Sequence, residues 1–156
     1  MSGFGLARWV IGLGVALAAG SAWADNSAFV GRWHLNLAES ILPPGEPAPK
    51  DLIAEISQAD SARVRWSLTV AAAEGQANVE TFDVIANGEL HPINDDTTAA
   101  FTVKGNFLES TFKGPNGQTD TLTCGLSADR SKMTCRGALS DGNGRTTTYV
   151  DVFDRM

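Results

Sequence analysis

The chain has 156 residues, 43% of them hydrophobic, and its 18 acidic against 12 basic residues give a net charge of −6. This length suits one domain with a single core. Binding to nucleic acid or docking on anionic lipid needs a surplus of Lys and Arg, so the acidic balance speaks against both partners.

Residues 1–24 have the three parts of a cleaved secretory signal. Arg8 supplies the positive charge, residues 10–19 form an apolar run, and Ala22 and Ala24 put small side chains at the cleavage positions. The run is shorter than the roughly 20 residues of a membrane-spanning helix, although a retained anchor is the alternative. We therefore expect a periplasmic or secreted domain of residues 25–156, starting at Asp25, with no membrane insertion after signal cleavage.

The rest of the chain shows the period-two alternation of β-strands with one buried face. In residues 29–37, Trp33 and Leu35 share a face with residues 29, 31 and 37, opposite Arg32 and His34. Residues 63–70 alternate in the same way. Less regular strands are predicted at residues 52–57, 77–85, 99–103, 106–113, 119–126, 131–139 and 145–153, with a short one possible at 89–93.

Turn-forming residues separate these segments, for example Asn87-Gly88, Lys104-Gly105 and residues 141–144. Such residues accept the positive φ of tight hairpins. The sequence therefore predicts an all-β fold, an antiparallel up-and-down meander of eight to ten strands. A meander of this length removes its edges most simply by closing into a barrel.

Residues 38–50 interrupt the pattern after the first strand, with four of the six prolines of the chain. Pro43 and Pro44 exclude a long helix here. The segment is a stiff crossover connection or, alternatively, a lid across one mouth of the barrel.

Cys124 and Cys135 are the two cysteines, and the compartment expected for the chain is oxidising. A four-residue turn at 128–131 pairs Ser127 with Lys132, which sets Cys124 opposite Cys135. That position is a non-hydrogen-bonded pair, whose Cα atoms are close enough for a disulfide. We predict a cross-strand disulfide within one hairpin, with two free thiols as the alternative.

The segment Phe29-Val-Gly31-Arg-Trp33 resembles the Gly-x-Trp signature that opens the first strand of lipocalin-like (calycin) barrels. Residues 33–40, 47–50 and 126–134 are similar to parts of a group of uncharacterised secreted bacterial proteins of this kind. The matching stretches cover about a third of residues 25–156. The further signature segments of the lipocalins proper are not found.

The resemblance implies structural roles for Gly31, Trp33 and a basic residue of the last strand. In calycins the signature Trp closes one end of the barrel, and the basic side chain packs across its ring. The last strand runs antiparallel to the first, which makes Arg155 the expected partner of Trp33 and Arg145 the second choice. Cation–π attraction supplies the physical basis of such a pair.

The barrel interior is the candidate binding site, and its lining is expected to include six apolar or aromatic side chains: Trp66, Leu68, Phe82, Phe101, Phe107 and Tyr149. A barrel of this size is either filled by its own side chains or holds one small ligand. The first function hypothesis is binding of a small apolar or amphipathic molecule. The second is a protein-interaction module with a filled barrel, such as an inhibitor or an envelope-assembly partner.

Enzymatic activity is a third and weaker hypothesis, and no catalytic residue is assigned. His34 is expected to face solvent, and His91 precedes Pro92 in a predicted loop, so no Ser-His-Asp arrangement follows. Two histidines and no Cys-x-x-Cys spacing argue against structural zinc. Asp141-Gly-Asn-Gly-Arg145 lacks the ligand spacing of an EF-hand and is better explained as a hairpin turn. We expect no metal and no cofactor. The oligomeric state stays open.

Overall fold

The computed structural model describes residues 27–72 and 75–156. Within them lie ten strands and one short 3₁₀ turn, Pro115–Gly117, and no α-helix. The strands are β1 Gly31–Leu35, β2 Asp51–Ala59, β3 Arg63–Ala71, β4 Ala77–Ile85, β5 His91–Pro92, β6 Thr98–Lys104, β7 Phe107–Lys113, β8 Thr119–Leu126, β9 Lys132–Ser140 and β10 Thr146–Arg155. The predicted all-β architecture of eight to ten strands is confirmed.

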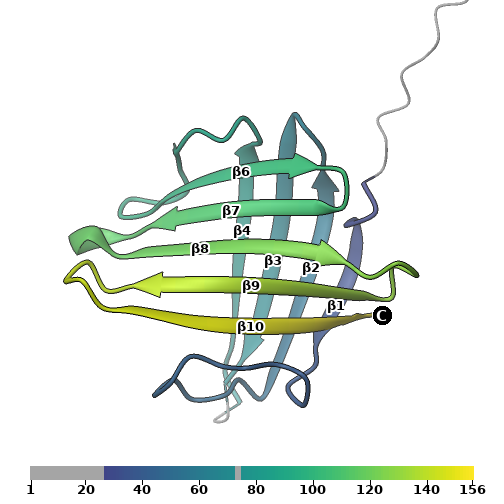
Figure 1. Ribbon diagram of the computed structural model, residues 1–156, viewed down its shortest axis with the longest axis horizontal. Helices are drawn as coiled ribbons and strands as arrows, with labels where there is room; N and C mark the ends of the chain where they lie inside the picture. The colour runs from purple at the N-terminus through teal and green to yellow at the C-terminus, as the bar shows by residue number, and fades with distance from the viewer. Residues whose placement is uncertain (1–26, 73–74) are drawn as a thin grey trace, which may run out of the picture.

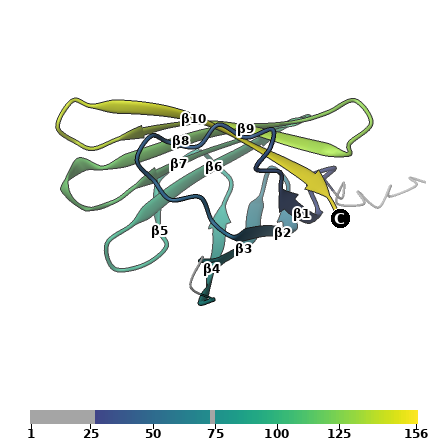
Figure 2. The ribbon, with the colours of Figure 1, turned by 90° about the horizontal axis from the view of Figure 1, so that it is seen from below.

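All ten strands form one antiparallel sheet in the order β4-β3-β2-β1-β10-β9-β8-β7-β6-β5. Each neighbouring pair joins strands that are consecutive in sequence, except β1 with β10. Figure 1 shows β6–β10 crossing in front of β2–β4 at a steep angle, and Figure 2 shows the two layers from below. The sheet is therefore rolled into a flattened, nearly closed barrel.

Strand β4 and the β5–β6 hairpin lie at the two ends of the sheet and share no backbone hydrogen-bond ladder. Aromatic side chains pack across this seam between them. The Phe82 ring of β4 lies 5.3 Å from the Phe112 ring of β7, and the Phe101 ring of β6 lies 5.6 Å from the same ring. Edge-to-face and tilted pairs at these distances are favourable. Side-chain contacts thus complete the wall where the ladder of hydrogen bonds stops.

The period-two alternation correctly predicts the inner face of most strands. Trp33 and Leu35 of β1 are buried, and Arg32 and His34 on the other face are exposed. Strand β1 is shorter than predicted, because the chain turns where the Glu39 backbone N–H donates to the Asn36 carbonyl at 3.2 Å. The turn leaves Leu37 39% exposed instead of placing it on the inner face.

The predicted disulfide is present in the predicted register. Strands β8 and β9 pair Cys124 with Cys135, Leu126 with Met133 and Leu122 with Gly137. The two cysteine sulfurs are bonded, with Cα atoms 3.9 Å apart, and both residues are fully buried. The bond fastens the two strands together inside the barrel wall.

Trp33 and Arg155 close one end of the barrel as the resemblance implied. The two residues are paired across β1 and β10, and the Arg155 Cζ lies 4.0 Å from the centroid of the Trp33 ring. The guanidinium also donates to the carbonyls of Ala28, at 2.6 Å, and Val30, at 3.0 Å. The indole Nε1 of Trp33 donates to the carbonyl of Phe29 at 2.9 Å.

Gly31 makes this end of the barrel possible. A Cβ at this position would lie 2.6 Å from Arg155 Nη1, and the backbone φ of +145° is a conformation that side-chain-bearing residues rarely adopt. The Gly-x-Trp segment and the arginine therefore act as one structural unit.

The predicted signal peptide, residues 1–24, lies outside the described residues. In the part of the chain that the structure describes, no helix has the length and apolar character that crossing a bilayer requires.

Candidate ligand-binding cavity

A cavity of about 230 Å³ lies inside the barrel. Strands from both layers line it, and most of its side chains are apolar or aromatic. The apolar lining consists of Leu52, Trp66, Leu68, Phe82, Phe112, Leu122, Cys135 and Phe153. The polar lining consists of Glu80, Asp120, Tyr149 and Asp151. The described interior is therefore partly open, with apolar walls and a small set of polar groups.

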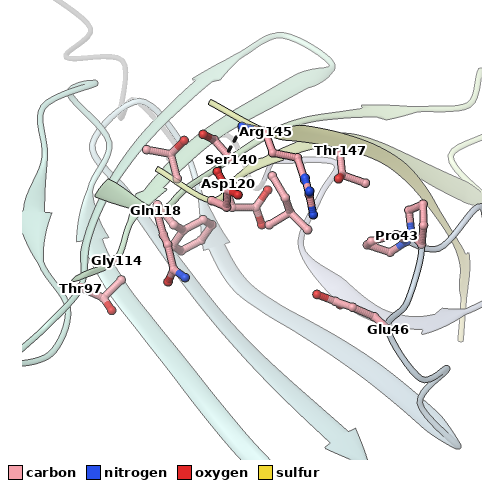
Figure 3. A pocket seen from close by; sticks show the side chains of 14 residues that line it. Pro43, Glu46, Thr97, Gly114, Gln118, Asp120, Ser140, Arg145 and Thr147 are labelled. Atoms are coloured by element: carbon pink, nitrogen blue, oxygen red, sulfur yellow. Dashed lines mark hydrogen bonds between the residues drawn. The ribbon is translucent and has the colours of Figure 1, made fainter. Parts of the chain in front are cut away.

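This cavity continues outward into a wider space of about 660 Å³ under the proline-rich segment. The two share four lining residues: Leu52, Asp120, Tyr149 and Asp151. A further opening of about 450 Å³ runs between the proline-rich segment and the hairpin end of β9 and β10. Figure 3 shows this opening, with Pro43 and Glu46 on one side, Gln118 and Thr97 on the other, and Arg145 at the rim. Asp120 lines all three spaces, so the acids lie between the apolar interior and the mouth.

The proline-rich segment passes over the mouth, a path that both the crossover and the lid hypotheses allow. Ile41 forms an isolated β-bridge with Val150 of β10, with backbone hydrogen bonds of 2.7 and 2.9 Å. At the other end, the Lys50 N–H donates to the Ala71 carbonyl of β3 at 2.9 Å. Between these two attachments the segment spans from one layer of the barrel to the other (Figure 2). Its prolines lower the entropy lost on holding this path.

Asp120, Tyr149 and Asp151 form a polar cluster on the inner face of β8 and β10. The Tyr149 hydroxyl donates to the Asp120 carboxylate, with both oxygens at 2.9 Å, and Asp151 has no side-chain hydrogen bond to another described residue. Burial raises the pKa of Asp151 to about 6, and the nearby Asp120 charge adds to this shift. Burial raises the pKa of Asp120 as well, although the hydrogen bond from Tyr149 opposes that shift. Burial and the Asp120 charge raise the pKa of Tyr149.

The absence of a side chain at Gly137 makes room for the Tyr149 ring. The two residues face each other in the β9–β10 register, and a Cβ on Gly137 would overlap the ring carbons and hydroxyl of Tyr149. The absence of a side chain at residue 137 therefore orients the phenol toward Asp120.

Four of the six predicted lining residues border the cavity: Trp66, Leu68, Phe82 and Tyr149. Phe101 is fully buried in the core and contacts Phe112 instead. The prediction that Phe107 lines the interior is wrong, because Phe107 lies outside the barrel and is 57% exposed. The inner positions of β7 are held by Leu108 and Ser110, so alternation turns Phe107 outward, where it packs beside Gly125 of β8.

The acids of the cavity were missed by the search for apolar lining. Asp120 shares the inner face of β8 with Leu122 and Cys124, and Asp151 shares the inner face of β10 with Tyr149 and Phe153. A period-two count outward from Cys124 would have found Asp120. The signal was a charged residue at an inward position, which is rare unless the charge has a use.

The histidines lie away from this cavity. The exposed His34 ring contacts the Asp51 carboxylate at 2.6 Å, and His91 contacts the Asn87 side chain at 2.9 Å. Among the described residues there is no group of three or more His, Cys, Asp or Glu side chains arranged to hold a metal ion.

The rolled sheet is similar in fold to solved structures of small β-barrel proteins. The fluorescent protein UnaG superposes with a TM-score of 0.56 at 18% identity, over 82% of this chain and 97% of that one. The fold is that of a lipocalin-like β-barrel. Zebrafish ileal bile acid-binding protein, solved with cholic acid, gives 0.51 at 17% identity, over 83% and 100% of the two chains. The fatty acid-binding protein of Drosophila melanogaster brain gives 0.53 at 12% identity, over 81% and 98%.

No protein-family model matches the sequence, and no curated protein matches it either. The likeness to the solved barrels therefore concerns the fold. What this chain does has to be argued from its own cavity.

Proposed function

We propose that this protein binds a small apolar or amphipathic molecule inside its barrel. The observation that carries the proposal is the continuity of the interior. Apolar walls around Trp66 and Phe82 lead through a polar cluster to a mouth crossed by the proline-rich segment. Concave, mostly apolar sites with a few placed polar groups are the usual form of small-molecule sites, and several hundred Å³ is their usual size. Proteins of similar fold include a bile acid-binding protein solved with cholic acid and a fatty acid-binding protein, which supports the same class of ligand.

Blocking the cavity tests this proposal. Leu122→Trp places an indole in the interior, whereas Leu90→Trp makes the same change at a residue that is 41% exposed and outside the cavity. The neutral dye N-phenyl-1-naphthylamine is titrated into both variants and the wild type, with circular dichroism as the check on folding. We expect saturable dye fluorescence with the wild type and Leu90→Trp, and a loss of at least tenfold in affinity with Leu122→Trp. Equal dye binding by all three proteins, or none by the wild type, would overturn the proposal.

We also propose that the protein is exported and acts in the periplasm or outside the cell. The composition of residues 1–24 and the Cys124–Cys135 disulfide support this, because disulfides persist in oxidising compartments. Intact-mass measurement of the protein from the cell envelope and medium tests it. We expect a chain that begins at Asp25, and a retained residue 1–24 segment would contradict the proposal.

A further inference from the structure

Nearly all charged side chains that line the cavity are acidic. Carboxyl groups reach its lining from four separate segments: Glu46 of the proline-rich segment, Glu80 of β4, Asp120 of β8 and Asp151 of β10. Within the described lining the one basic side chain is Arg145, at the outer rim, and it forms no ion pair with another described residue. The part of the cavity between the rim and Trp66 is therefore lined by acids and a phenol without a described cation.

The outer surface of the same barrel is built differently. Several acids there are paired with bases: Lys132 contacts Asp154 at 2.7 Å and Glu39 at 3.0 Å, and Arg65 contacts Asp83 at 3.2 Å. Asp120 and Asp151 have no such partner among the described residues, although they are less exposed than the paired acids. Removing carboxylates from water without a compensating charge is costly, so the interior is poised to accept a positive charge.

A second observation, at Trp66, also points to a ligand. Trp66 is 5% exposed and lines the cavity, and its Nε1–H has no hydrogen-bond acceptor among the described residues. Buried donors are normally paired, and an unpaired one costs about 1–3 kcal/mol. A ligand with an oxygen acceptor on its apolar body would satisfy this indole.

Granted the proposed function, we propose that the ligand of this cavity is a cationic amphiphile, with an amine or quaternary ammonium head at Asp120 and Asp151 and an apolar body against Trp66 and Phe82. The head offsets the charge of the two carboxylates. The body fills the apolar depth of about 230 Å³. A carboxylate ligand would add a further negative charge beside Asp120 and Asp151, where the low dielectric strengthens repulsion.

Three ligands of one chain length separate charge from apolar contact: decyltrimethylammonium, decanol and decanoate. Each is titrated at pH 7.5, below its micelle concentration, by displacement of the neutral dye from the wild-type protein. We expect the cation to bind at least about tenfold tighter than decanoate, with decanol between them. Equal affinities, or tightest binding of decanoate, would overturn the cationic preference and leave the proposed function standing. Failure of all three to displace the bound dye would overturn the cationic-amphiphile proposal alone, whereas failure of the wild type to bind the dye would overturn the proposed function as well.

Two variants assign the preference to the acids. Asp120→Asn and Asp151→Asn each remove one interior charge, whereas Asp83→Asn removes one from the exposed face of β4. We expect each interior variant to lose most of the discrimination between cation and decanoate while decanol affinity changes by less than about threefold. Asp83→Asn should keep the wild-type order and spacing. Discrimination that survives both interior variants, or falls as far in Asp83→Asn, would refute the assignment to these carboxylates.

Discussion

Asp151→Asn should stabilise the ligand-free protein at pH 7.5 and lose that effect in acid. The pKa of Asp151 is raised from 3.8 to about 6 in the folded state by burial and by the Asp120 charge. The folded protein therefore binds more protons than the unfolded chain between about pH 4 and pH 6. Above about pH 6 the ionised Asp151 carboxylate lowers the free energy of unfolding by its full amount. This loss of stability disappears as the pH falls through 6 toward 4.

The size of the effect follows from the shift. Roughly two pKa units at about 1.36 kcal/mol each set an upper bound of about 3 kcal/mol. Asp151 borders a cavity that water can enter, and screening by that water reduces the expected gain to about 1–2 kcal/mol. An asparagine of similar shape cannot ionise, so it removes the penalty without emptying the position.

Urea denaturation of the wild type and Asp151→Asn at pH 4, 5, 6, 7 and 7.5 measures this directly. The variant should gain stability in the upper part of this range and converge on the wild type near pH 4. Asp83→Asn is the matched control with the opposite sign, because Arg63 and Arg65 lower the pKa of the exposed Asp83 carboxyl. It should lose stability at neutral pH. A pH-independent difference for Asp151→Asn, or a loss of stability at pH 7.5, would refute the buried-charge explanation.

Three further variants test the walls of the barrel. Arg155→Lys should lower the free energy of unfolding by about 1–3 kcal/mol in urea denaturation, because an ammonium cannot reproduce the stacking on Trp33 together with the forked contacts to backbone carbonyls; an unchanged stability would contradict this. Gly137→Ala should lower the free energy of unfolding by about 1–3 kcal/mol by displacing Tyr149. In the same urea denaturation, Gly114→Ala should cost less, because a Cβ there would meet its nearest described neighbour at 3.6 Å. Replacing both bridging cysteines by alanine should cost about 2–3 kcal/mol, and reduction of the wild type with dithiothreitol should give a similar loss; full stability after reduction would refute a stabilising role for the bond.

The sequence predicted the strands of this barrel better than the residues that line its interior. Alternation, turn residues and the position of two cysteines depend on local geometry, and they located the strand ends to within about two residues and the β8–β9 register to the residue. The pairing of Trp33 with Arg155 followed from the resemblance to calycin barrels, with the antiparallel direction of the first and last strands selecting Arg155. The strand and register predictions required only that neighbouring strands alternate and pair.

The interior was predicted less well, because aromatic residues were assigned to it by type and not by position. Phe107 and Phe112 are five positions apart on β7, and residues at an odd offset along a strand face opposite sides. Phe112 is the one that lines the cavity. Asp120 and Asp151 were overlooked for the converse reason, since a charged residue is expected outside and these two occupy inward positions. The path of residues 38–50 over the mouth depends on long-range contacts such as the Ile41–Val150 bridge, which composition does not specify.

The pairing of β1 with β10 also governs the order in which this barrel can form. Every other pair of neighbours in the sheet is consecutive in sequence, so β1–β4 and β5–β10 can each form through shorter connections, the longest of which is the proline-rich segment between β1 and β2. The two halves join through β1 and β10, which is the longest loop closure of the fold and therefore its slow step. Until residue 155 has left the ribosome, β1 keeps an unpaired edge, and such edges are targets for aggregation and for chaperones. The contact of Arg155 with Trp33 thus marks the step that joins the two halves into one barrel and pairs the edges of β1 and β10.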